Sequence, residues 1–278
     1  MKTGFSLMVL AFSLSAQPAH AVTDCFDKTG LPGSFEVQIE SGGMTRTFLL
    51  DIPADYDPSR KTPVVFNFHG WLMTAEGQAA YTDMPTRGTS AGFIVIHPQG
   101  YLRSFNAGTC CGLAMLEQLD DVGFTLDMLD YVSDNYCIDV DRVHSTGFSN
   151  GGFMSNRLAC ELPDVFASIA PVSGLIGVPC NPDRVVPVHQ SQGVQDVLVW
   201  YPRAVKDNRK WAEINGCEDQ SIVYYEAGDV TCSFYPHCEA PAEVEFCATK
   251  GVGHAWVDED WYHTTDENLA FFIEHPMP

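Results

Sequence analysis

The chain has 278 residues, 45% hydrophobic and 18% charged, which is enough to bury the core of one large domain or two small ones. Its 23 glycines and 17 prolines are too few for a collagen-like or a low-complexity disordered protein. With 15 Lys and Arg against 36 Asp and Glu, the net charge of −21 argues against nucleic acid and anionic membranes as partners.

The first residues have the pattern of a secretory signal peptide. Lys2 supplies a positive start, residues 5–14 form an apolar run, and Ala19-His20-Ala21 has small residues at the spacing of a cleavage site. The run is shorter than the roughly 20 residues that cross a bilayer, so no membrane anchor is expected. We therefore predict a signal peptide over residues 1–21 and one domain over residues 22–278. The mature protein should be extracellular or, in a cell with two membranes, periplasmic.

Export makes disulfide bonds the expected state of the ten cysteines. The alternative is a zinc site near Cys232, His237 and Cys238. No paired Cys-x-x-Cys spacing accompanies those residues, so we predict no metal.

The predicted domain opens with an antiparallel hairpin. Residues 35–39 alternate between apolar and polar as a half-buried strand does, Ser41-Gly42-Gly43 suits a turn, and residues 45–52 suit the returning strand. Dense apolar runs follow at residues 64–68 and 93–96. Such runs are typical of strands that are buried on both faces of a parallel sheet.

Strands and helices alternate after these runs. Residues 120–136 carry Val122, Leu126, Leu129 and Val132 at helical spacing. Further strands are predicted at residues 142–148, 166–172, 185–189, 222–225 and 244–248, and helices at 151–160, 204–215 and 264–273, the last with Thr264-Thr265-Asp266-Glu267 as a capping box. This order predicts the α/β class: a mostly parallel central sheet with antiparallel N-terminal strands and helices on both faces, as in the α/β-hydrolase fold.

The candidate nucleophile is Ser149. It lies in Gly147-Phe148-Ser149-Asn150-Gly151, a G-x-S-x-G motif between a predicted strand and a predicted helix. A sharp turn there needs small neighbours, because the nucleophile has a strained backbone and its hydroxyl stands clear of the sheet. The alternative is an ordinary tight turn with an idle serine.

A serine hydroxyl needs a base, and in this fold an acid and then a histidine follow the serine in the chain. His254 lies in a glycine-rich loop directly after the strand predicted at 244–248, whereas His237, His263 and His275 lie in less suitable places. Asp196 follows the strand predicted at 185–189, with Asp229 in reserve. We predict a Ser149–His254–Asp196 triad, in which the aspartate orients the imidazole.

Ester cleavage also needs two donors for the oxyanion. The backbone amide of Asn150, which follows the nucleophile, is the first candidate. The second should come from the loop after the strand at 64–68. Trp71 is preferred there, with Gly70 and Leu72 as alternatives.

Together these motifs resemble the secreted feruloyl esterase and polyhydroxybutyrate depolymerase families, which are related to carbohydrate esterase family one. The stretches that carry the resemblance are Phe66-Asn67-Phe68-His69-Gly70, His97-Pro98-Gln99-Gly100, Asp120-Asp121-Val122-Gly123-Phe124, Cys137-Ile138-Asp139, Thr146 through Gly152, Leu158-Ala159-Cys160, Ala170 through Gly174, Asn215-Gly216-Cys217 and Gly253-His254-Ala255-Trp256.

The resemblance implies hydrolysis of carboxylic esters on polymers or their fragments, through a serine acyl-enzyme and without a cofactor, by a protein that we expect to be a monomer. It maps the triad onto the same three residues, and Trp200, Tyr201 and Trp256 become candidate substrate-binding residues. The chain departs from the family pattern at Gln192, which replaces a histidine, at Trp200, where a proline is common, and at Val252, which replaces a glycine. Trp200 and Val252 are expected to reshape the acyl pocket.

The cysteine pairings are only partly predictable. Cys137 precedes the nucleophile strand and Cys160 ends the helix that runs back beside it, so these two are expected to pair. Cys217, Cys232, Cys238 and Cys247 are expected to form two bridges. Cys110, Cys111 and Cys180 are placed on the active-site side, where one bridge would stiffen the pocket; their partners, and that of Cys25, stay open.

Three functions fit these observations. A feruloyl esterase that acts on plant cell-wall polysaccharide esters is preferred. A depolymerase of polyhydroxybutyrate or another polyester comes second. The third is a catalytically silent secreted binding protein, against which the intact Ser149, Asp196 and His254 argue.

Overall fold

The structure is a computed structural model that describes residues 25–259 and 262–278. The predicted signal peptide, residues 1–21, lies outside the described residues. It therefore stays a prediction, as does the single domain over 22–278. None of the helices that the structure describes is long and apolar enough to cross a membrane.

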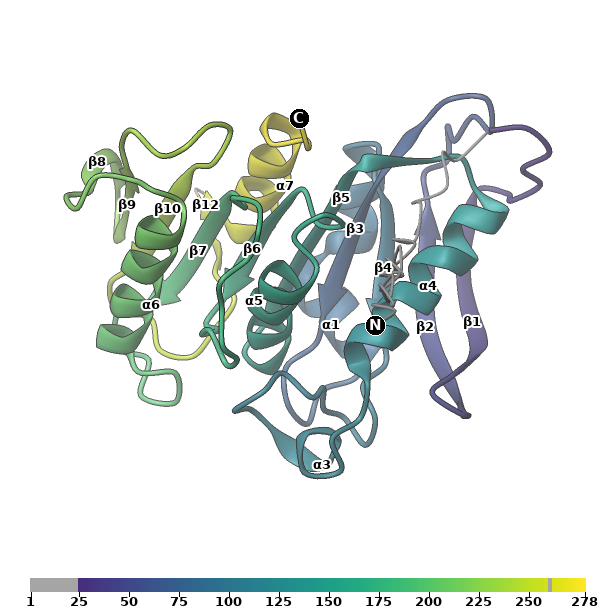
Figure 1. Cartoon of the computed structure of the whole chain (residues 1–278), viewed down its shortest axis with the longest axis horizontal. Coiled ribbons are helices and arrows are strands. Elements are labelled where there is room, and N and C mark those ends of the chain that lie inside the picture. Colours follow the sequence, from purple (N-terminus) through teal and green to yellow (C-terminus); the bar gives the residue numbers. More distant parts are fainter. Residues whose placement is uncertain (1–24, 260–261) are drawn as a thin grey trace, which may run out of the picture.

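A ten-stranded sheet runs through the molecule in the order β1-β2-β4-β3-β5-β6-β7-β10-β9-β8 (Figure 1). Its strands are β1 (Gly33–Ser41), β2 (Met44–Ile52), β3 (Thr62–Phe68), β4 (Ile94–Pro98), β5 (Ile138–Phe148), β6 (Ser168–Val172), β7 (Val188–Gly193), β8 (Ile222–Ala227), β9 (Val230–Tyr235) and β10 (Val244–Thr249). The six central strands, from β4 to β10, are parallel, and the strands at both ends are antiparallel. A separate two-stranded ladder joins β11 (Asp258–Glu259) and β12 (Tyr262–His263).

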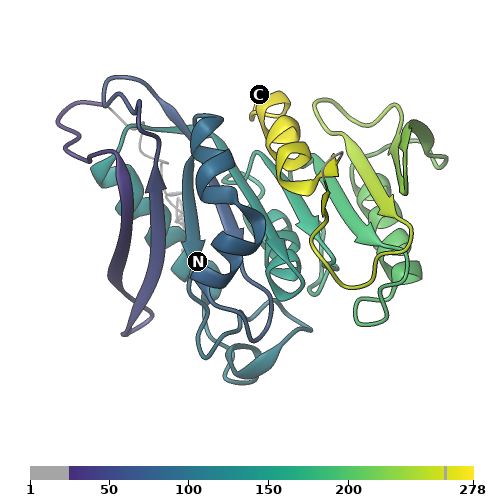
Figure 2. The same ribbon diagram turned by 180° about the vertical axis from the view of Figure 1, so that it is seen from behind.

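Helices cover both faces of this sheet. They are α1 (Ala75–Thr82), α2 (Met84–Ser90), α3 (Gly112–Leu116), α4 (Asp121–Asn135), α5 (Asn150–Glu161), α6 (Tyr201–Ile214) and α7 (Thr264–Glu274). Helices α4, α5 and α6 lie on the face toward the viewer in Figure 1, and α1, α2 and α7 lie on the face shown in Figure 2. The predicted α/β class and α/β-hydrolase architecture are confirmed.

The apolar runs of β3 and β4 are buried because both faces of the sheet are covered. Every residue of the two strands is buried. Val64 and Phe66 belong to the core cluster under α4 and α5, whereas Val65, the residue between them, packs with Phe272 of α7. Side chains of a strand alternate between faces, so a strand in the middle of such a sandwich needs apolar residues at consecutive positions.

The opening hairpin agrees with its prediction, and several details differ. Ser41 faces Met44 across the two-glycine turn. The strand predicted at residues 185–189 is β7 and starts three residues later, at Val188, and β9, α1, α2 and α3 were not predicted. The capping box is wrong: α7 has His263 at its N-cap and no side-chain cap. The hydroxyl of Thr265 is used elsewhere, since it donates to the carbonyl of Thr82 at 2.6 Å.

All ten cysteines are in disulfide bonds. The two bridges expected among the late cysteines are confirmed as Cys217–Cys238 and Cys232–Cys247. Cys232 and Cys238 are in two different disulfide bonds, so neither offers a thiolate to the alternative zinc site near His237. The described residues contain no group of side chains that could hold a metal ion.

The predicted Cys137–Cys160 bridge is wrong. Cys137 bonds to Cys25, which is held nearby because the amide of Gly30 donates to the carbonyl of Asn135 at 3.0 Å. Cys160 bonds to Cys180, at the end of α5 away from Ser149, so Cys180 is not on the active-site side. The fifth bridge joins the neighbours Cys110 and Cys111.

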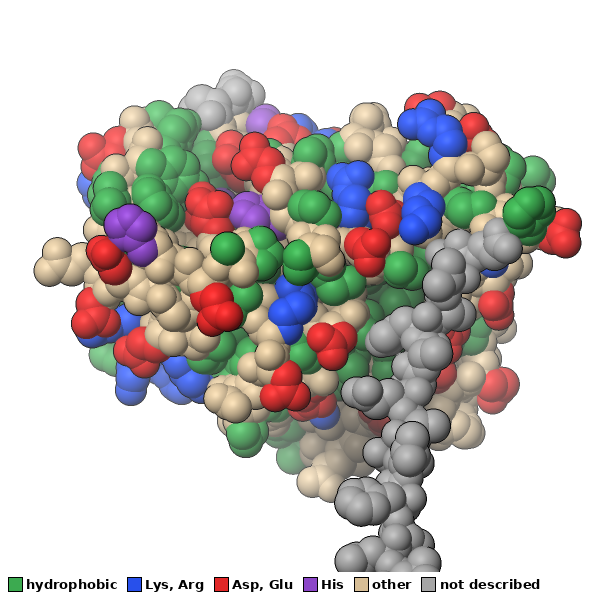
Figure 3. Space-filling model, turned by 45° about the horizontal axis from the view of Figure 1, so that its top comes forward, with side chains coloured by type: hydrophobic (Ala, Val, Ile, Leu, Met, Phe, Trp, Pro, Cys, Tyr) green, Lys and Arg blue, Asp and Glu red, His purple; other side chains and the backbone are tan. Residues whose placement is uncertain are grey.

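Charged side chains are spread over the surface. On the face shown in Figure 3, acidic groups lie among hydrophobic side chains and next to several Lys and Arg side chains. The negative charge of this face is therefore distributed and does not form one acidic block.

Candidate active site

Ser149 lies at the sharp turn between β5 and α5, where the G-x-S-x-G spacing has a steric cause. Its backbone has φ 54° and ψ −116°, a conformation that is strained for a residue with a side chain. A β-carbon on Gly151 would come within 2.0 Å of the carbonyl oxygen of Phe68, and one on Gly147 within 2.6 Å of the Gly151 backbone. The amide of Ser149 donates to the carbonyl of Val172 at 2.9 Å, which ties the turn to β6.

Asp196 and His254 form a hydrogen-bonded pair. Nδ1 of His254 lies 2.7 Å from Oδ2 of Asp196, whose carboxylate is fully buried. The amides of Leu198 and Val199 each donate to Oδ1 at 2.9 Å, and Nε2 of Gln192 donates to Oδ2 at 2.9 Å. A buried carboxylate needs such donors, so the turn after β7 is built to hold this one in place.

Gln192 explains one departure from the family pattern. Its amide nitrogen reaches both the Asp196 carboxylate and the carbonyl of Val199, at 2.9 Å each. The glutamine therefore holds the Asp196 carboxylate directly, a contact that the sequence alone did not reveal.

One cavity brings the serine and the histidine together. It has a volume of about 640 Å³, within the range of ligand pockets, and both Ser149 and His254 line it. Trp71, Leu198 and Trp200 form parts of its wall, with 51%, 75% and 59% of their surfaces exposed. Trp71 is thus a cavity residue rather than a core tryptophan.

The structure narrows the choice of oxyanion donor. The amide of Leu72 donates to the carbonyl of Arg103 at 2.9 Å, so it is already used. Among the described residues, the amides of Trp71 and Gly70 have no such backbone partner, so the structure excludes only Leu72. Trp71 remains the preferred second donor beside Asn150.

Asn150 also has a side-chain role that sequence reasoning missed. Its Oδ1 accepts from the amide of Phe105 at 2.7 Å, and its Nδ2 donates to the carbonyls of Phe105 and Cys110 at 3.1 Å each. The residue after the candidate nucleophile therefore clamps the loop that carries the Cys110–Cys111 bridge. That bridge lines the cavity, so one disulfide does border the candidate site.

Two of the three candidate substrate-binding residues lie outside the cavity lining. The Tyr201 ring packs on Phe246, with ring centroids 6.0 Å apart. Trp256 is 4% exposed, packs with Phe148 in the core, and donates through Nε1 to Thr265 at 3.1 Å. The family resemblance made them candidates, but their side chains point into packed regions.

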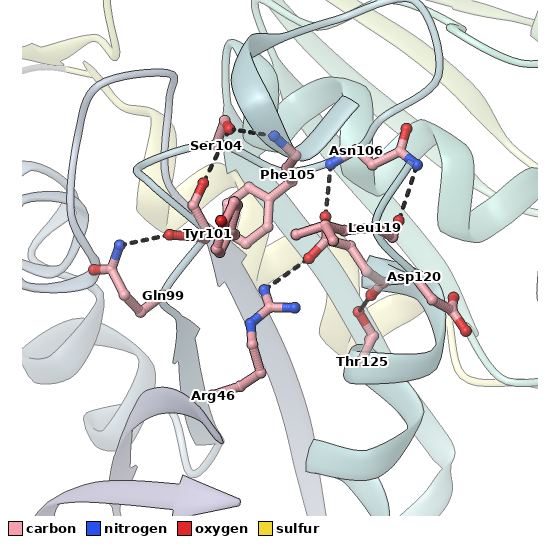
Figure 4. A network of polar contacts seen from close by, with 12 residues as sticks. Arg46, Gln99, Tyr101, Ser104, Phe105, Asn106, Leu119, Asp120 and Thr125 are labelled. Atoms are coloured by element: carbon pink, nitrogen blue, oxygen red, sulfur yellow. Dashed lines mark hydrogen bonds and ion pairs between the residues drawn. The ribbon is translucent and has the colours of Figure 1, made fainter. Parts of the chain in front are cut away.

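A buried ion pair anchors the cavity loop from below (Figure 4). Nη2 of Arg46 on β2 lies 2.7 Å from Oδ1 of Asp121, and the two side chains are 6% and 0% exposed. Oδ2 of Asp121 accepts from the amide of Asn106 at 2.7 Å, and the guanidinium of Arg46 lies 3.9 Å from the centre of the Phe124 ring. Because Asn106 follows Phe105, this pair and Asn150 hold adjacent residues of the same loop.

His69 supports the other side of the site as a neutral ring. The amide of Gly100 donates to its Nε2 at 2.9 Å, so Nδ1 carries the proton and donates to the carbonyl of Gly70 at 2.8 Å. Burial lowers the pKa of His69 to about 4. Protonation of Nε2 would break the bond to Gly100.

This geometry predicts a loss of stability in acid. The pKa of a histidine in an unfolded chain is about 6.5, so the unfolded state takes up a proton there before the folded state does. The contribution of His69 to the free energy of unfolding is complete well above pH 6.5 and falls as the pH drops toward 4. The fall between pH 6.5 and 5 is about 1.5 kcal/mol. Urea unfolding at pH 6.5 and 5 measures how much the free energy of unfolding changes between the two. This change should be smaller for His69→Gln than for the parent. The matched control is His237→Gln, since His237 is exposed; an equal pH dependence in His69→Gln and the parent would contradict the prediction.

The other candidate groups are occupied elsewhere. His237 pairs with Glu218 on the surface, His263 with Asp258, and His275 with Glu243. The reserve acid, Asp229, lies in the turn between β8 and β9.

Sequence comparisons find similarity between this chain and two kinds of known hydrolase. Residues 117–178, which contain Ser149, match a family model described as the prolyl oligopeptidase family. Feruloyl esterase B of Piromyces equi is 27% identical over 235 residues, which cover 76% of this chain and 42% of that protein. Feruloyl esterase D of Neurospora crassa is 28% identical over 232 residues, 78% of this chain and 76% of that protein. The chain thus spans less than half the length of the first relative.

Solved structures agree on the fold. An acetyl xylan esterase from Aspergillus awamori superposes with a TM-score of 0.65 at 16% identity, over 87% of this chain and 99% of the other. A ferulic acid esterase superposes with a TM-score of 0.61 at 14% identity, over 88% and 99%. At such low identities the likeness concerns the fold alone.

Proposed function

We propose that this chain, an ester hydrolase that has the α/β-hydrolase fold and resembles feruloyl esterases, is a secreted serine esterase acting on feruloyl esters of plant cell-wall polysaccharides. The observation that carries the proposal is the buried Asp196–His254 pair, 2.7 Å between Oδ2 and Nδ1, on a cavity that Ser149 also lines. The relatives named as feruloyl esterases support the choice of acyl group.

In the proposed mechanism His254 takes the proton of Ser149, and the alkoxide attacks the ester carbonyl. Asp196 holds the imidazole in the tautomer that leaves Nε2 free to act and stabilises its charged form. The amides of Asn150 and Trp71 bind the oxyanion, the alcohol leaves with the proton from His254, and water then releases the acid.

The shape and chemistry of the cavity support an aromatic acyl group. The exposed indoles of Trp71 and Trp200 offer faces on which a phenolic ring can stack. An opening lined by large exposed side chains also suits an ester that is attached to a polymer.

Secretion belongs to the same proposal. Five disulfide bonds accord with an oxidising compartment, and the predicted signal peptide accords with export. The proposed partner is a polysaccharide ester outside the cell.

A polyester is the second candidate substrate because apolar side chains are exposed at the cavity and directly beside it. Val197 and Leu198, directly after Asp196, are 82% and 75% exposed. Exposed apolar groups of this kind can contact a water-insoluble polymer surface.

The test compares methyl ferulate with the clearing of a polyhydroxybutyrate film, using the parent and a Ser149→Ala control. We expect hydrolysis of methyl ferulate by the parent and no clearing of the film. Film clearing without ferulate release would replace the substrate by a polyester. Turnover of neither substrate, together with no labelling of Ser149 by a fluorophosphonate, would contradict a serine esterase.

A further inference from the structure

The lining of the cavity has an unusual charge for this protein. Acidic residues outnumber basic ones by 36 to 15 in the chain, yet the described residues that line the cavity include no Asp or Glu. Arg203 is the one Lys or Arg among them. A positive group therefore borders the cavity that holds the candidate nucleophile, within an otherwise acidic molecule.

Among the described residues, Arg203 has no direct ion-pair partner; Asp207, one turn further along α6, interacts with it electrostatically without forming an ion pair within 4.0 Å. In the described part of the chain its guanidinium makes no ion pair within 4.0 Å and no hydrogen bond, and its side chain is exposed. Other helical arginines are paired: Arg157 lies 2.9 Å from Glu161, and Arg209, two turns further along α6, lies 3.5 Å from Glu213. The charge of Arg203 is thus only partly balanced by Asp207, and its guanidinium is free to contact a bound molecule.

The position of Arg203 adds to its effect. It lies in the first turn of α6, where its amide donates to the carbonyl of Trp200 at 2.8 Å. The amino-terminal end of a helix favours negative charge, and α6 is 14 residues long. The guanidinium and the apolar wall formed by Trp200 both border the cavity, so an anion bound there would meet a positive charge beside an apolar surface.

We propose that Arg203 selects esters that carry a carboxylate near the scissile bond. A guanidinium binds a carboxylate through charge-assisted hydrogen bonds, and an apolar wall beside it reduces screening by water. The carboxylate could belong to the acyl part, as in a monoester of a dicarboxylic acid, or to the alcohol part, as in a uronic acid of a polysaccharide. The inference rests on the proposed function, because it concerns the same site.

Two pairs of matched esters show whether the recognised carboxylate belongs to the acyl part or to the alcohol part. For the acyl side, the anionic 4-nitrophenyl hydrogen glutarate is compared with its neutral methyl ester. For the alcohol side, 4-carboxyphenyl butyrate is compared with 4-(methoxycarbonyl)phenyl butyrate. Each variant is characterised by the ratio of kcat/KM for the anionic ester to kcat/KM for the neutral one, so differences in intrinsic reactivity cancel between variants.

Arg203→Gln should lower this ratio by about 5- to 10-fold in one of the two pairs, mainly through KM, and leave the neutral esters within about 2-fold. Arg203→Lys should retain part of the preference. The matched control is Arg209→Gln, which removes the same charge from the same helix outside the cavity lining and should leave the ratio unchanged. Raising NaCl from about 0.05 to 0.5 M should weaken the preference in the parent and not in Arg203→Gln.

An unchanged ratio for both pairs in Arg203→Gln would overturn the inference, and so would an equal loss on anionic and neutral esters. Failure of the proposed function has a different signature. In that case the parent would hydrolyse neither neutral ester, and Ser149 would not react with a fluorophosphonate.

Discussion

Ser149→Ala should yield a folded protein whose ester hydrolysis is reduced at least ~10³-fold. The loss should be this large because the serine hydroxyl forms the covalent bond in the proposed mechanism, and no neighbouring group replaces it. The oxyanion donors and the cavity would remain, so a residual rate above the uncatalysed one is expected.

The stability of Ser149→Ala should stay close to that of the parent. Alanine meets the same unfavourable backbone conformation, φ 54°, as serine does, and the amide that donates to Val172 at 2.9 Å is kept. Thermal unfolding would establish the fold of the variant, and kcat/KM on methyl ferulate or 4-nitrophenyl butyrate would measure its activity. Ser133→Ala, at an exposed hydroxyl on α4, is the matched control and should keep full activity. Retained turnover in Ser149→Ala would rule out this serine as the nucleophile.

Asp121→Asn should lower the free energy of unfolding by about 3–5 kcal/mol, the usual cost of removing one member of a buried ion pair. The substitution leaves the guanidinium of Arg46 buried, 6% exposed, without the carboxylate that now lies 2.7 Å from it. It also weakens the acceptor for the amide of Asn106, so the cavity loop loses one of its anchors.

Urea unfolding would measure this loss, with Asp120→Asn as the matched control. Asp120 precedes Asp121 and is exposed; as the N-cap of α4 it accepts from the amide of Gly123 at 2.8 Å. Asparagine caps a helix about as well as aspartate, so the control should change stability by less than about 0.5 kcal/mol. The double variant with Arg46→Met and Asp121→Asn should recover part of the lost free energy of unfolding, because no unpaired charge remains buried. Equal effects of the two single substitutions would contradict a special role for the buried pair.

The predictions for Ser149→Ala and Asp121→Asn depend on different kinds of information. The first follows from a five-residue motif, and the local structure around Ser149 agrees with it: β5 ends at Phe148 and α5 begins at Asn150. The second could not be made from the sequence, because Arg46 and Asp121 are 75 residues apart and both residue types are usually exposed.

The same contrast applies to the rest of the site. His254 and Asp196 were predicted from their positions after strands, and the structure brings them to 2.7 Å, while their catalytic roles stay predictions. Tyr201 and Trp256 were predicted from the family resemblance, and their side chains lie outside the cavity lining. A residue's place along the chain predicts the end of the sheet at which its backbone emerges, but not which way a side chain turns.

The residue pattern was sufficient for the opening hairpin, the turn at Ser149 and most of the strands, though not for β9, because periodicity and glycine spacing act over a few consecutive residues. The cysteine partners, the loop clamp made by Asn150 and the unpaired charge of Arg203 depended on the folded chain. Cys137 bonds to Cys25 across 112 residues, and Asn150 reaches Phe105 across 45. Contacts at such separations are set by the paths of loops in three dimensions, about which the local sequence carries little information.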